Sequence, residues 1–188
     1  MTLRTVLPLI LAFLAGPAFA GTASPCTDDG AFGIAFGSKP PRGVRKLYDS
    51  GSAIWYEVRP PRADSRFDRY EIRVDRKANE IYEIVGITSI LPQPRTTAEA
   101  ERITPEQKTE AAAKADALAL QYLEALPPEM RGVMKHSSFG GASWGGHVTE
   151  ALHLDISSDV HWTVRVSCRD RKREETFGRR ALKEWLKK

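Results

Sequence analysis

Two histidines and an aspartate form the group whose residue types are best suited to chemistry. His153 and Asp155 alternate with apolar residues, so both are expected on the polar face of a strand. If residues 157–159 form a three-residue hairpin loop, His161 on the next strand lies opposite Asp155 and diagonal to His153. Two imidazoles and a carboxylate on one face can bind zinc or copper, or act as an acid and base pair. The alternative is an ordinary solvated sheet face, because the spacing matches no standard metal-binding motif.

A glycine-rich segment between Phe139 and His147 is the second candidate. It contains four glycines together with Phe139, Trp144 and His147. Glycine permits backbone conformations that other residues avoid, and tryptophan is frequent at the centre of protein interfaces. We therefore expect a loop that presents Trp144 to a partner, with burial of Trp144 in the core as the alternative. His147 would join His153 and Asp155 only if this loop folds back.

Positive charge is concentrated in the C-terminal segment. Residues 169–188 include nine basic and four acidic residues, whereas residues 21–168 include 18 basic and 20 acidic ones. An amphipathic helix is expected here, with Arg179, Arg180 and Lys183 largely outside its apolar stripe. The stripe consists of Phe177, Ala181, Leu182 and Trp185. Such a helix can steer a protein partner or rest on an anionic membrane, and the alternative is that its stripe covers a sheet.

Motifs that would identify an enzyme give little support for catalysis. The sequence has no HExxH, SxxK or CxxC pattern, and no glycine-rich motif that binds nucleotide phosphates. A hydrolase with two catalytic carboxylates is the alternative that the abundance of acidic residues leaves open. Residues 21–188 contain 27 basic and 24 acidic residues, an excess too small to indicate nucleic acid binding. The sequence therefore favours a protein that is not an enzyme.

The periodicity of apolar residues predicts the elements that position these groups. Strands are expected over 52–58, 69–75, 80–90, 132–139, 149–156 and 160–168. Between them, Thr104, Pro105 and Gln107 form the cap and capping box of a long central helix. A second helix is expected at the C-terminus. These elements predict an α+β fold in which helices cover one face of an antiparallel sheet. The halves 27–126 and 130–188 each resemble a β-meander followed by a helix.

The N-terminal segment and the two cysteines indicate export. Residues 6–15 are a run of ten apolar residues, too short to span a bilayer, and residues 18–20 match a signal peptidase site. Residues 1–20 are therefore predicted to be a signal peptide, and the remainder a single exported domain. In an oxidising compartment, Cys26 and Cys168 are expected to form a disulfide bond.

Together these features predict an exported, disulfide-stapled, non-catalytic binding protein of a bacterial-type periplasm or cell envelope. An inhibitor, an immunity protein or an accessory protein fits this description, with another envelope protein as its partner and no cofactor. Trp144 would be its anchor, and Arg179, Arg180 and Lys183 its steering charges. The first alternative is a metal-binding or metal-dependent protein that uses the histidine and aspartate group. Peripheral attachment to an anionic membrane through the C-terminal helix is the second.

Overall fold

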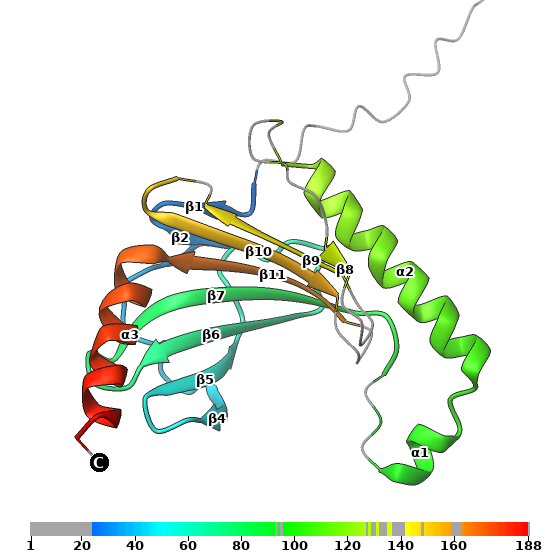
Figure 1. The fold of residues 1–188 in the computed structure, drawn as a ribbon, viewed down its shortest axis with the longest axis horizontal. Coiled ribbons are helices and arrows are strands. Elements are labelled where there is room, and N and C mark those ends of the chain that lie inside the picture. The colour runs from blue at the N-terminus through cyan, green and yellow to red at the C-terminus, as the bar shows by residue number, and fades with distance from the viewer. Residues whose placement is uncertain are drawn as a thin grey trace, which may run out of the picture.

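An eight-stranded antiparallel sheet organises the chain, in the strand order β4-β5-β6-β7-β11-β10-β9-β8 (Figure 1). Its strands are β4 (Arg45–Asp49), β5 (Ala53–Val58), β6 (Arg69–Asp75), β7 (Glu80–Ser89), β8 (Lys135–His136), β9 (Ala142–His147), β10 (Leu152–Ser158) and β11 (Thr163–Asp170). This computed structural model describes residues 24–92, 94, 96–126, 128, 131, 135–136, 142–147, 149–158 and 163–187. The predicted signal peptide lies outside these residues. The predicted α+β class is confirmed.

A small sheet and three helices accompany the main sheet. The small sheet contains β1 (Cys26–Thr27), β2 (Gly30–Ala31) and β3 (Ile34–Ala35), and the helices are α1 (Thr97–Glu101), α2 (Pro105–Glu124) and α3 (Arg171–Trp185). The turn between β2 and β3 has φ values of 52° at Phe32 and 79° at Gly33. Positive φ at both central residues is the geometry of the tight turns that suit a β-hairpin. None of the described helices is long and apolar enough to cross a membrane.

Each half of the chain contributes four consecutive strands to the main sheet; α1 and α2 follow the first four, and α3 follows the second four. The last strands of the two halves, β7 and β11, pair antiparallel at the centre of the sheet, with Val166 opposite Gly86. The two long helices, α2 and α3, take different positions. Helix α2 contacts β9, β10 and β11, whereas α3 contacts β7 and β11 at the other end of the strands (Figure 1).

One face of the main sheet, which we call the core face, is covered by α2 and by the small sheet. Ile72, Ile84, Leu154 and Cys168 are fully buried there. Helix α2 turns a stripe of mostly small side chains to this face: Ala111, Ala115, Ala119, Tyr122 and Leu123. Burial of this apolar surface is the main stabilising term of the fold.

The cap predicted for α2 is confirmed in every contact. The hydroxyl of Thr104 accepts a hydrogen bond from the backbone N–H of Gln107 at 3.3 Å, and the Gln107 side chain accepts one from the N–H of Thr104 at 2.9 Å. Pro105 occupies the first helical position, where a missing N–H carries no cost. These contacts fix the start of the helix independently of its packing.

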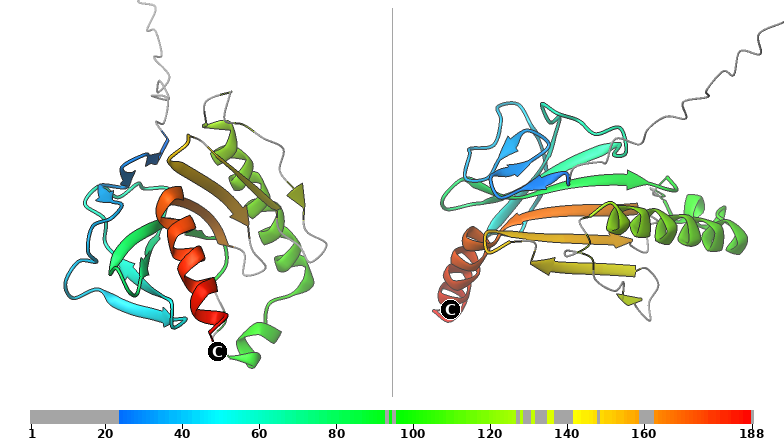
Figure 2. Two further views of the ribbon diagram at one scale, coloured as in Figure 1. Left: turned by 60° about the vertical axis from the view of Figure 1, so that its left-hand side comes forward. Right: turned by 90° about the horizontal axis from the view of Figure 1, so that it is seen from above.

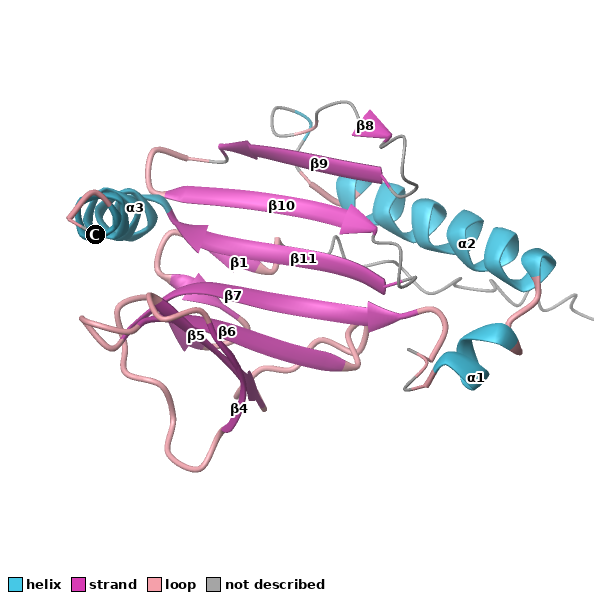
Figure 3. Cartoon of the chain, turned by 60° about the horizontal axis from the view of Figure 1, so that its bottom comes forward, coloured by secondary structure: helices cyan, strands magenta, loops and turns pink. Residues whose placement is uncertain are grey.

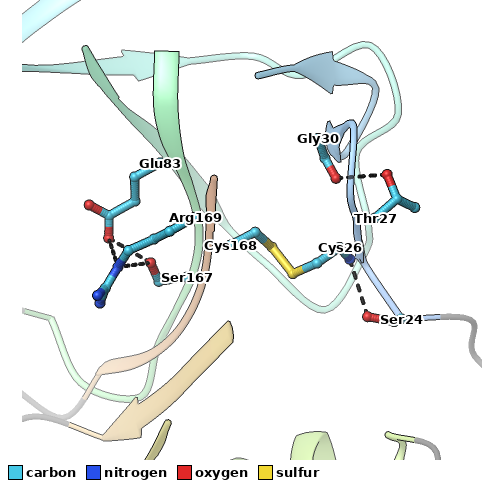
Figure 4. The surroundings of a disulfide bond; sticks show 8 residues. All are labelled: Ser24, Cys26, Thr27, Gly30, Glu83, Ser167, Cys168 and Arg169. Atoms are coloured by element: carbon cyan, nitrogen blue, oxygen red, sulfur yellow. Dashed lines mark hydrogen bonds and ion pairs between the residues drawn. A yellow bond between two sulfur atoms is a disulfide. The ribbon is translucent and has the colours of Figure 1, made fainter. Parts of the chain in front are cut away.

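The predicted disulfide between Cys26 and Cys168 is also confirmed (Figure 4). It joins β1 to the central strand β11, with the two Cα atoms 5.7 Å apart, and it closes a sequence separation of 142 residues. Phe32 of the small sheet's turn belongs to the same core cluster, with ring centroids 5.3 Å from Phe67 and 5.0 Å from Tyr70. The staple therefore holds the small sheet over the aromatic part of the core.

Candidate functional site

The face of the main sheet opposite α2 is lined with charged side chains, and we call it the arginine face. Residues paired across neighbouring strands share a face. The pairing aligns Arg69 with Ile87 and Arg165 in one row, Glu71 with Val85 and Ser167 in the next, and Arg73 with Glu83 and Arg169 in the third. Four arginines and two glutamates thus occupy three adjacent rows on β6, β7 and β11.

Glu83 is one of two buried carboxylates in these rows. It accepts hydrogen bonds from the Ser167 hydroxyl at 2.5 Å, from Nε of Arg169 at 3.1 Å and from Nη1 of Arg73 at 3.3 Å. Burial alone would favour the neutral form of Glu83, but the charge of Arg169 and the bond from Ser167 outweigh it, so the pKa of Glu83 is lowered. Glu83 is therefore an ionised acceptor that fixes the two guanidinium groups above it.

Glu71 has the same role one row away. It is buried, and its carboxylate lies 3.4 Å from Nε of Arg69 and 3.3 Å from Nη2 of Arg165. The arginine side chains are more exposed than the carboxylate they contact, with 37% and 34% of their surfaces open against 10% for Glu71. The carboxylates thus form a lower layer, and the guanidinium groups form the layer that faces outward.

An aromatic stack borders the arginine face on β4 and β5. Trp55 lies between Tyr48, at a ring-centroid distance of 5.3 Å, and the guanidinium of Arg73, which is 4.4 Å from the Trp55 ring centroid. Tyr48 is the outermost member, with 61% of its surface exposed. Tyrosine, tryptophan and arginine are the residues most enriched at the energetic centres of protein interfaces. A preformed stack of the three is a candidate binding site.

Helix α3 stands at one end of the arginine face rather than across it (Figure 3). Phe177 stacks on Tyr82 of β7 with ring centroids 5.1 Å apart, and Arg180 binds Asp75 of β6 at 2.8 Å. The prediction that both helices cover one face is therefore wrong. The strands already bury their core face beneath α2 and the small sheet, so α3 packs on the opposite side. The predicted steering charge Arg180 is held by Asp75, whereas Arg179 and Lys183 are exposed.

His153 and Asp155 lie on the arginine face, as the alternation predicted. Nε2 of His153 is 3.3 Å from Oδ1 of Asp155, and Asp155 also binds the guanidinium of Arg169. The predicted hairpin register is wrong, because the pairing places Asp155 opposite Ser167 and continues β10 to Ser158. Strand β10 continues through Ser157 and Ser158, which the prediction placed in the loop, and this shifts the pairing.

The metal group stays a prediction. Its third member, His161, lies outside the described residues. Within those residues, no three side chains of His, Cys, Asp or Glu are grouped as metal ligands. Of the proposed ligands, Asp155 is already bound to the cation of Arg169, and that ion pair competes with a metal for its carboxylate.

Residues 142–147 of the glycine-rich segment form strand β9, so the prediction of a loop is wrong for this part. Residues of β9 pair with β10, with Trp144 opposite Ile156 and His147 opposite His153. Trp144 is 8% exposed and belongs to the hydrophobic core, so its predicted role as an exposed anchor is also wrong. Its position in the strand turns it toward the core face beneath α2. The remaining member of this group, Phe139, lies outside the described residues.

The glycines of β9 serve close packing. A Cβ atom on Gly145 would lie 2.1 Å from Oδ1 of Asp155, and one on Gly146 would lie 3.2 Å from the ring of Trp144. Real Cβ atoms do not approach other atoms as closely as the first of these distances. Glycine at these positions therefore makes room for neighbouring side chains within the sheet.

The sequence also contains one GxSxG pattern, at residues 141–145. In hydrolases this pattern occupies a sharp turn from a strand into a helix, which exposes the serine as a nucleophile. Here Ser143 lies inside β9 and pairs with Ser157, and the strand continues to His147. The structural context of a nucleophile is therefore missing around Ser143.

Sequence reasoning missed Glu83, Trp55 and Arg73 as a connected group. The charged side of β6 was visible in its alternation, which indicated a solvated face. Strand β7 does not alternate between polar and apolar residues, because Val85 and Ile87 are buried on the same face as Glu83. A register shift also lies beside Arg73, where β6 pairs with β7. Only the pairing of the strands brings these residues together. The chain matches no protein-family model, no curated protein and no solved structure.

Proposed function

We propose that this chain is an exported, disulfide-stapled, non-catalytic binding protein that holds another protein of the cell envelope against its arginine face. The observation that carries the proposal is the stack of Tyr48, Trp55 and Arg73 beside guanidinium groups fixed over buried carboxylates. A rigid surface loses little conformational entropy on binding, which favours affinity.

The state of the buried carboxylate supports a binding role over a catalytic one. A general acid or base is most effective when its pKa lies near the working pH. The pKa of Glu83 is lowered instead, and its oxygens are occupied by three donors, those of Ser167, Arg169 and Arg73. Its contribution is to hold arginine side chains in place.

The chemistry of the surface defines the expected partner. In the three central rows, four guanidinium groups lie over two buried carboxylates, with Asp155 beside Arg169. The partner surface should therefore be acidic where it meets the arginines, and opposite charge accelerates and orients the encounter. Tyr48 projects beside this layer and should enter an apolar pocket of the partner. The disulfide, which forms in oxidising compartments, supports a partner in the same envelope.

Site-specific photo-cross-linking tests this proposal in cells that produce the protein. A photoreactive benzophenone amino acid replaces Tyr48 in one variant and Leu120 in a control variant. Leu120 is an exposed apolar residue on α2, which packs on the core face, so like Tyr48 it is exposed but it lies away from the arginine face. We expect one protein adduct from position 48 that disappears when Arg165→Glu is added. Adducts from position 120 alone, or an adduct from position 48 that is insensitive to Arg165→Glu, would contradict the proposal.

A further inference from the structure

We propose that the C-terminal turns of α3 dock this protein on the surface of an anionic lipid bilayer. Leu182, Trp185 and Leu186 are exposed to 57%, 71% and 68%. Spacings of three and four residues place them on one side of the helix. We call these three residues the α3 stripe, and it is separate from the arginine face.

The opposite side of α3 is attached to the sheet, which fixes the direction of the stripe. Phe177 stacks on Tyr82, and Arg180 binds the buried carboxylate of Asp75. Figures 1 and 2 show the last turns of the helix extending beyond the strands. The helix is therefore formed before it meets a membrane, and binding carries no cost of folding.

A row of cations runs beside the α3 stripe. Arg179, Lys183 and Lys187 follow one another at intervals of four residues and are exposed. None of them forms an ion pair with any residue of the described chain. Two acidic residues of α3 already have cationic partners, since Glu175 binds Arg171 at 3.3 Å and Glu184 lies 3.7 Å from Lys77. The cations are therefore available to an external anion.

This combination fits a bilayer surface. Interfacial helices place tryptophan and leucine in the boundary between head groups and acyl chains, while lysine and arginine reach the phosphates. The charge of the row selects an anionic surface, where each basic side chain strengthens binding about fivefold. The short stripe predicts reversible, peripheral attachment.

Co-flotation with vesicles tests the inference on the disulfide-bonded chain of residues 21–188. Vesicles of phosphatidylcholine with phosphatidylglycerol are compared with pure phosphatidylcholine vesicles. We expect binding to the anionic vesicles only, with a loss of most of it as salt rises from about 0.1 M to about 1 M. The double variant Arg179→Gln/Lys183→Gln should weaken partitioning by about 25-fold. The double variant Leu182→Ala/Trp185→Ala should weaken it by at least about tenfold.

Matched controls on α2 separate the site from general surface properties. Leu120→Ala removes an exposed apolar side chain and Lys108→Gln an exposed cation, and both should leave partitioning unchanged. Equal binding to neutral and anionic vesicles, or equal losses in the α2 controls, would overturn the inference. No vesicle binding, together with a protein adduct from a photoreactive residue at Leu186, would assign the stripe to a protein partner. Loss of vesicle binding leaves the adduct at Tyr48 unaffected, so the two proposals fail independently.

Discussion

The arginine face and the outer side of α3 use the same cationic residue types in opposite ways. On the arginine face, Arg73 and Arg169 both bind Glu83, and the carboxylate is buried beneath them. On α3, Arg179 and Lys183 are exposed and form no ion pair within the described chain. The comparison shows that residue type alone does not separate a structural cation from an available one.

The backbone explains this difference. Antiparallel strands hold side chains of neighbouring strands about 5 Å apart on the same face, so charges on adjacent strands must pair or repel. A helix attached by one side leaves its other side facing water, where long cationic side chains have no neighbouring element. Pairing therefore stabilises the sheet, whereas the unpaired cations of α3 contribute little to folding.

Removing the buried carboxylate should have the largest effect on this comparison. Glu83→Ala leaves the charges of Arg73 and Arg169 without their shared partner, and breaking a buried ion pair costs about 3–5 kcal/mol. Glu184→Ala is the matched control, because Glu184 is exposed and lies 3.7 Å from its cation. Urea denaturation monitored by circular dichroism measures both. Similar free energies of unfolding for the two variants would contradict the structural role of Glu83.

Two tryptophans sharpen the contrast between core and surface. Trp144 is buried beneath α2, so Trp144→Ala should lower the free energy of unfolding by about 3 kcal/mol. Trp185 is 71% exposed, and Trp185→Ala should change it by less than about 0.5 kcal/mol. Thermal denaturation of the two variants provides the comparison. A strong loss of stability in Trp185→Ala would show that the α3 stripe is packed rather than exposed.

Adjacent arginines on α3 offer a smaller and more local test. Arg180→Gln breaks the bond to buried Asp75 and should cost about 1–3 kcal/mol. Arg179→Gln removes an exposed cation without a partner in the described chain and should be nearly neutral for folding. Hydrogen exchange of α3 amides would locate the loss. If Arg179→Gln loosens the helix as much as Arg180→Gln, the distinction between paired and unpaired cations fails.

The contribution of Glu83 in the sheet to the free energy of unfolding should change only at acidic pH. Because the pKa of Glu83 is lowered in the folded state, its stabilisation is fully present above the unfolded value of about 4.3 and disappears as pH falls through the folded value. Urea midpoints of the wild type should therefore drop below about pH 4 more steeply than those of Glu83→Gln. Parallel curves for the two proteins would remove Glu83 from the acid transition. Between about pH 5 and 7 the contribution of Glu83 should stay constant.

Local signals in the sequence predicted much of the fold. The strand predicted over residues 69–75 has the same bounds as β6, and the capping box places the start of α2 at the observed residue. The prediction succeeded where neighbouring residues alone decide the conformation.

The candidate site was harder to predict because it depends on register. A loop one residue longer or shorter changes which residue faces Asp155, and periodicity does not report loop length. Trp144 was similarly ambiguous, because glycine-rich segments are typical both of loops and of closely packed strands. Tyr48, Trp55 and Arg73 come from three strands, and only their pairing brings them into contact.

Local propensity and the presence of only two cysteines were enough to predict the fold class, the start of α2 and the pairing of Cys26 with Cys168. The tertiary structure alone decided that Trp144 is buried, that Glu83 carries two arginines and that α3 keeps an apolar stripe exposed. The physical reason is that burial is a property of facing surfaces. A residue is covered only when an element distant in the sequence packs against it, and the residues around it do not encode which element that is.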